Sequence, residues 1–193
     1  MSRIGRSLTE LMKLVPPPDD PVDVGDARAW AKIQTKLGLQ FPADFRAYCD
    51  AYGSGAIFDP GRLSITIHSP LCEIYDKAFE SHCSVFREMK EFEGDEFVPY
   101  EIYPQSPGLL PWASDDNGNS VLWLTSGAPK DWTTVFNPRG GYKEWYEYSE
   151  PMTGFLVKAI RHQLDPLPWP DPFFTGPVAP VFVRRGDPGR YRR

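Results

Sequence analysis

Cysteine is scarce in this chain, and long apolar runs are missing. The three cysteines, Cys49, Cys72 and Cys83, are an odd number without a Cys-x-x-Cys pair, which argues against a disulfide framework and a structural zinc site. No stretch reaches the roughly 18 consecutive apolar residues that a membrane-spanning helix needs. Polar residues interrupt the apolar run after Arg3 and Arg6, so no signal sequence is predicted. We therefore expect a cytoplasmic protein without a membrane segment.

Residue patterns that carry catalysis are also few. The three histidines, His68, His82 and His162, include no i, i+4 pair of the kind that binds zinc on a helix. No phosphate-binding loop, dinucleotide fingerprint or paired-carboxylate motif is present. The acidic stretch 115–119 resembles the start of a calcium loop, but its twelfth position, which needs glutamate, holds Ser126. The sequence predicts no metal, no cofactor and no catalytic residue, and hence a protein that is not an enzyme.

Positive charge is concentrated at the C-terminal end. The chain has a net charge of −5, yet residues 184–193 hold five arginines and one acid, Asp187. Subtracting that +4 from −5 leaves −9 for the other 183 residues. An acidic body of this size repels nucleic-acid phosphate and attracts basic partners. We expect a basic protein partner and no direct binding of nucleic acid; the sequence leaves the oligomeric state open.

Length and composition fit one folded domain with short extensions. The 193 residues are 41% hydrophobic and 24% charged, which is typical of a globular protein. Residues 1–25 are predicted to be a helix, begun by a capping box at Ser7-Leu-Thr-Glu10, and a proline-rich linker. Residues 26–164 form the main domain. Residues 165–193 are predicted to be a proline-rich extended tail that ends in arginine-rich sequence.

The main domain combines helical spacing with strand alternation. Apolar periodicity predicts helices at 26–38, 42–53, 69–92 and 151–164. Strands of an antiparallel meander are predicted at 62–67, 109–113, 121–125, 133–136 and 142–148. Gly53-Ser54-Gly55 predicts a turn, and Asn117-Gly118 predicts a type I′ hairpin turn between two of the strands.

Two features are candidates for binding a partner. The segment 73–101 has nine acidic and three basic residues, and its densest part holds Glu88, Glu91, Glu93, Asp95 and Glu96. Such a run is either a solvated surface or a steering patch for a basic partner. Four tryptophans lie in the strand region, and one or two of them, Trp112 or Trp145, would anchor a partner if they lie at an exposed edge.

The order of several short motifs resembles the SMI1/KNR4 (SUKH) family over about residues 26–164. The motifs are Trp30-x-x-Ile33-x-x-x-Leu37-Gly38, Phe41-Pro42-x-Asp44-Phe45, Tyr52-Gly53-Ser54-Gly55, Asp116-Asn117-Gly118-Asn119 with Trp123, Gly127-x-Pro129-x-x-Trp132, and Phe155-Leu156. The family's usual Leu-Pro stands here as Phe41-Pro42. The resemblance implies an α+β fold with helices packed on a twisted, mainly antiparallel sheet.

The same resemblance implies a function. Bacterial members of the family are interpreted as immunity proteins that bind and neutralise secreted toxins, often nucleases or deaminases, whereas fungal members are regulatory scaffolds. The family has no catalytic residues to transfer. We therefore expect an immunity protein that occludes the active site of a cognate toxin. The alternative is a regulatory scaffold that binds endogenous partners without a toxin.

Overall fold

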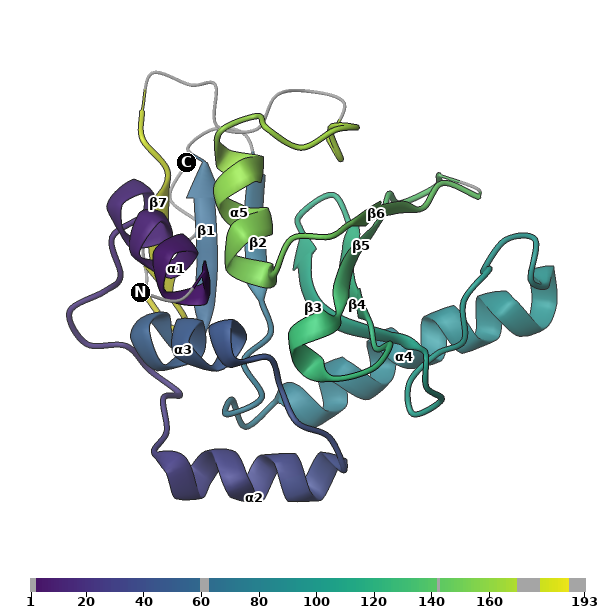
Figure 1. The fold of residues 1–193 in the computed structure, drawn as a ribbon, viewed down its shortest axis with the longest axis horizontal. Coiled ribbons are helices and arrows are strands. Elements are labelled where there is room, and N and C mark those ends of the chain that lie inside the picture. Colours follow the sequence, from purple (N-terminus) through teal and green to yellow (C-terminus); the bar gives the residue numbers. More distant parts are fainter. Residues whose placement is uncertain (1–2, 60–62, 142, 170–177, 188–193) are drawn as a thin grey trace.

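In the described part of the chain, seven strands form one antiparallel sheet (Figure 1). The computed structural model describes residues 3–59, 63–141, 143–169 and 178–187. The strand order is β6-β5-β4-β3-β2-β1-β7. The strands are β1 Gly55–Asp59, β2 Leu63–Ile67, β3 Leu109–Asp115, β4 Ser120–Leu124, β5 Thr133–Asn137, β6 Tyr146–Tyr148 and β7 Val181–Arg184. The predicted α+β fold with a mainly antiparallel sheet is confirmed.

Helices pack against both faces of this sheet. Trp123 of β4 contacts Phe45 of α3 (Ala43–Tyr52), with ring centroids 4.8 Å apart, whereas Ser120 of the same strand hydrogen-bonds His82 of α4 (Tyr75–Glu93). Residues three apart in a strand point to opposite faces, so α3 and α4 lie on opposite sides. Helix α5 (Met152–Ile160) shares the face of α3, because its Phe155 packs against Trp112.

The first helix begins earlier than its capping box predicted. Helix α1 spans Arg3–Leu14, and Ser7 lies inside it rather than at its N-cap. The Ser7 hydroxyl is 2.6 Å from the hydroxyl of Thr153 in α5. Helix α1 packs against α3 and α5 (Figure 1). Leu11 in this helix and Val15 just after it are fully buried. Tertiary packing therefore sets the start of this helix.

The next two helices begin and end close to the predicted residues. Helix α2 (Ala27–Leu37) is capped by the carboxylate of Asp26, which accepts the amide of Ala29, and it ends at left-handed Gly38. Helix α3 has Pro42 as its N-cap and begins at Ala43, one residue after the predicted first helical position at Pro42. After Gly53, the chain enters β1 at Gly55, where only a turn was predicted.

The turn between β3 and β4 differs from the prediction in type but not in place. Gly118 has a φ of 84° and its amide donates to the Asp115 carbonyl, while Asn117 does not take the positive φ that a type I′ turn requires. The Asp115 carboxylate instead accepts the backbone amides of Asn117 and Asn119. The predicted strand pairing is confirmed, since Leu110 lies opposite Trp123 and Pro111 opposite Leu122.

Two segments of the predicted tail join the fold. Trp169 is buried, and its indole N–H donates to the Asp115 carboxylate at 2.7 Å. Strand β7 pairs with β1 at the edge of the sheet, so residues 165–193 contain regular structure that the sequence did not indicate. Residues 170–177 and 188–193, which include most of the arginine-rich end, lie outside the described residues.

Candidate partner-binding site

The acidic residues predicted to face a partner lie at the C-terminal end of α4 and in the loop that follows. Helix α4 extends away from the other helices, and its last turns project from the sheet (Figure 1). All five predicted side chains are exposed: Glu88, Glu91, Glu93, Asp95 and Glu96. The structure therefore brings these carboxylates together on one protruding part of the molecule.

Three of the five carboxylates have no counter-ion among the described residues, namely Glu88, Glu91 and Glu93. The other two are paired. Lys90 contacts Asp95 and Glu101, and the hydrogen bond that its ammonium donates to Asp95 raises the pKa of Lys90. Lys143, from the loop before β6, contacts Glu96 and lies 5.0 Å from the centre of the Phe97 ring. The two lysines near the end of α4, Lys90 and Lys143, are thus already paired with Asp95, Glu101 and Glu96.

The position of the free carboxylates opposes the stability of α4. A helix C-terminus has a partial negative charge, and acidic side chains there destabilise the helix by about 0.3–1 kcal/mol each. Glu91 and Glu93 lie in the last turn of α4, and Glu88 lies one turn before Glu91, where like charges repel. These three glutamates therefore do not stabilise α4. Their charge does contribute to solubility.

An apolar stripe runs through the same acidic surface. Val85, Met89 and Phe92 follow one another at i, i+4 and i+7, which places them on one side of α4. Phe92 is 81% exposed and Val85 is 49% exposed, while Met89 is half-buried. Helical spacing identifies the stripe but does not show that the helix end projects beyond the sheet.

A groove of about 380 Å³ lies beside the stripe. Its apolar lining includes Val85, Met89 and Phe97. The opposite wall comes from the β3–β4 turn and the β5–β6 loop, which contribute Gly118 and Arg139 among others. The groove is large enough for one or two apolar side chains, and free Glu93 stands at its margin.

Of the two tryptophans predicted as anchors, one lies in the core and the other lies beneath the acidic loop. Trp112 is 1% exposed and stacks on Trp123 within the core, so it lies away from the surface and is not an exposed anchor. Trp145 is half-buried beneath the acidic loop, where its indole N–H donates to the carbonyl of Phe97 at 2.9 Å. Its ring packs against Phe86 of α4. Trp145 therefore holds the acidic loop against the helix.

The histidines and cysteines of the described residues form no metal site. Among residues 3–59, 63–141, 143–169 and 178–187, no three histidine, cysteine or acidic side chains are placed to hold a metal ion. Burial raises the pKa of the Cys83 thiol to about 12 and raises that of Cys49 further, which keeps both thiols protonated. No helix in the described residues is long and apolar enough to cross a membrane.

The fold and the surface together define an α+β protein built on one antiparallel sheet, with free carboxylates and exposed apolar side chains at one helix end. Residues 26–158 match the model of the SMI1 / KNR4 family (SUKH-1). This match spans more than half of the chain, so the protein belongs to that family, as its motifs predicted. Neither a curated protein nor a solved structure matches the chain significantly.

Proposed function

We propose that this protein is a cytoplasmic immunity protein that binds a basic toxin through the C-terminal end of α4. The observation that carries the proposal is the combination of three unpaired glutamates with the exposed side chain of Phe92 on one projecting surface. Membership of the SMI1/KNR4 family supports it, because the family includes immunity proteins. In this function the protein turns over no substrate and needs no cofactor.

The chemistry of the surface favours a toxin that acts on nucleic acid. A nuclease or a nucleic-acid deaminase presents positive charge where it holds phosphate. Carboxylates on α4 are attracted to that same region, and so the binding protein covers the substrate cleft. Charge at the margin of an interface mainly raises the association rate, whereas desolvated aromatic side chains slow dissociation. Glu88, Glu91 and Glu93 would have the first role and Phe92 the second.

Co-expression tests this function directly. The toxin encoded beside the gene for this protein is expressed in cells with or without the wild-type chain. Rescue of growth, together with a stable complex of the two purified proteins, is the expected result. Growth arrest that the wild-type chain does not relieve, with no complex formed, would contradict the immunity function and favour a scaffold that binds endogenous partners.

A matched pair of variants locates the surface. Phe92→Ala removes the exposed aromatic ring of α4, and Leu167→Ala removes an exposed apolar side chain near the end of the domain. We expect Phe92→Ala to raise the dissociation rate about 30-fold or more, since an anchoring residue contributes about 2 kcal/mol or more to binding. Leu167→Ala should leave the rate unchanged. Equal rates for both variants would move the interface away from α4.

A further inference from the structure

The C-terminal strand β7 covers an edge of the sheet that the rest of the domain leaves unpaired. β7 is antiparallel to β1, in a register that pairs Ala56 with Val183 and Ile57 with Phe182. Strand β1 is almost fully buried and is mostly apolar. Without β7, β1 would be an edge strand with exposed backbone donors and acceptors, and such edges readily pair with another chain.

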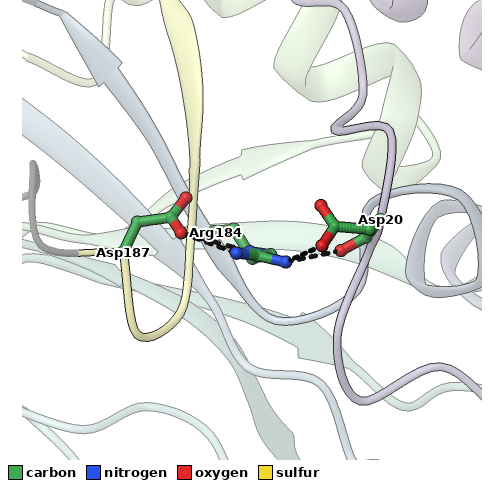
Figure 2. Close-up of polar contacts among 3 residues, drawn as sticks. All are labelled: Asp20, Arg184 and Asp187. Carbon is green, nitrogen blue, oxygen red and sulfur yellow. Dashed lines mark hydrogen bonds and ion pairs between the residues drawn. The ribbon is translucent and has the colours of Figure 1, made fainter.

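Two arginines hold β7 in place. Figure 2 shows Arg184 between two carboxylates: it contacts Asp20 in the N-terminal linker, and its guanidinium donates to Asp187 at 2.9 Å. Arg185 forms a two-point contact with Asp23, at 2.8 and 3.1 Å. Burial tends to raise the pKa of Asp23, but hydrogen bonds including those from Arg185 outweigh it and lower the pKa. These residues constitute an arginine clasp between linker and β7.

The clasp is electrostatic and only partly buried, with Asp23 16% exposed and Asp20 80% exposed, and β7 itself buries little surface. None of its four residues is fully buried, and Val181 is 43% exposed. Phe182 makes the main apolar contact, with its ring 5.1 Å from that of Tyr52 and against Gly55. The side chain of Asp20 is 80% exposed, and exposed ion pairs contribute little and weaken with salt. Strand β7 is therefore among the elements of this fold that can separate most easily.

The segments that form the clasp lie outside the part of the chain shared with the family. The family match covers residues 26–158, while Asp20, Asp23 and β7 fall before and after it. The partner strand β1 lies inside the matched part. The strand edge thus lies within the part that matches the family, and the strand that covers it lies outside that part.

We propose that the β1 edge is a strand-docking site and that β7 of a second copy can occupy it, which gives a reciprocally strand-exchanged dimer. A second copy supplies the same Phe182 contact and the same arginines for Asp20 and Asp23. The exchanged dimer keeps every β1–β7 contact. The contacts that are lost when β7 separates from its own chain therefore form again when it docks on the second copy. Eleven residues separate Trp169 from Val181, and a chain of that length spans at most about 36 Å at about 3.3 Å per residue, which sets the limit on how far β7 can extend toward a second copy.

Disulfide trapping in the full-length chain tests the exchange. One preparation has Ala56→Cys and the other Val183→Cys, both with Cys72→Ser to remove the half-buried native thiol. The two are mixed and incubated at about 0.05 M or about 1 M salt, where screening weakens the clasp, and are then oxidised. Because residues 56 and 183 of separate molecules meet only when β7 is exchanged, a cross-linked dimer reports docking.

Two controls make the result decisive. The chain with both substitutions should form an internal disulfide and stay monomeric, which checks the register. Val178→Cys replaces an exposed residue before β7 and reports random collision when mixed with Ala56→Cys. We expect at least about fivefold more dimer from the register pair than from the Val178→Cys pair, with more at high salt. The proposal would be overturned if the register pair gave no more dimer than the Val178→Cys pair at either salt concentration. It would also be overturned if the double variant formed no internal disulfide.

Discussion

Acidification should destabilise the fold through a partly buried pair of histidines. His68, after β2, and His82, in α4, pack edge to face with ring centroids 5.9 Å apart. His82 Nε2 lies 2.7 Å from the Ser120 hydroxyl, and His68 Nε2 lies 3.3 Å from the Ser114 hydroxyl. Burial lowers the pKa of His68 to about 4, and the neighbouring His82 adds to this effect. Both imidazoles are therefore neutral in the folded protein at pH 7.

The sign and size of the effect follow from the pKa difference. An unfolded histidine has a pKa of about 6.5, so between pH 6.5 and 4 the unfolded chain binds more protons at His68 than the folded chain. The free energy of unfolding must then fall as the pH is lowered through this window. For a folded pKa of about 4, the loss is about 2 kcal/mol at pH 5 and about 3 kcal/mol at pH 4.

Urea unfolding of the wild type and of His68→Gln at pH 7 and pH 5 isolates this contribution. Glutamine does not titrate, and its side-chain amide can still hydrogen-bond Ser114. Other groups titrate in both proteins and cancel in the comparison. The wild type should lose about 2 kcal/mol more than His68→Gln over this pH change. Equal losses would refute the claim that a partly buried, neutral His68 makes stability depend on pH.

Three further substitutions test the packing that positions the surface. Trp169→Ala should lower the free energy of unfolding in urea by about 3–5 kcal/mol, because it removes a ring 5.0 Å from Phe136 and the hydrogen bond to Asp115; a loss below 1 kcal/mol would mean that Trp169 is not part of the core. Gly118→Val should cost about 1–3 kcal/mol, since its φ is +84° and a Cβ would lie 2.8 Å from Arg139 Cδ; an unchanged melting temperature would contradict this. Asp26→Ala should cost about 1 kcal/mol by removing the α2 N-cap, whereas Asp26→Asn should restore most of it in the same thermal assay.

Sequence motifs predicted those helices and strands whose ends are determined by residues close by in the sequence. Asp26 and Gly38 bound α2 as expected, because a side-chain cap and a left-handed glycine act within one turn. The β3–β4 pairing was also predictable from alternation and from the turn position. The turn type was not, because the Asp115 carboxylate, which also accepts the Trp169 N–H, stabilises a different geometry.

Elements that depend on distant contacts were missed. β1 is short and begins at Gly55, and its pairing with β2 and β7 was not apparent from the local sequence. β7 depends on Phe182 meeting Tyr52 and on arginines meeting linker acids, which are pairings across more than a hundred residues. The acidic part of the candidate site was predictable as a charge run. The exposure of Val85 and Phe92 was not, because it depends on how far α4 extends past the sheet.

Association kinetics at two ionic strengths test whether the unpaired carboxylates on α4 steer a basic toxin to this surface. Glu88, Glu91 and Glu93 are changed to lysine, and a control variant has the same change at exposed Asp19, Asp131 and Asp165. Lysine suits a helix C-terminus, so the α4 variant should be at least as stable as the wild type. At low salt we expect its association rate with the toxin to fall about tenfold or more, well beyond the control, with the difference narrowing at high salt. Equal association rates for the two variants at low salt would show that Glu88, Glu91 and Glu93 do not steer the toxin.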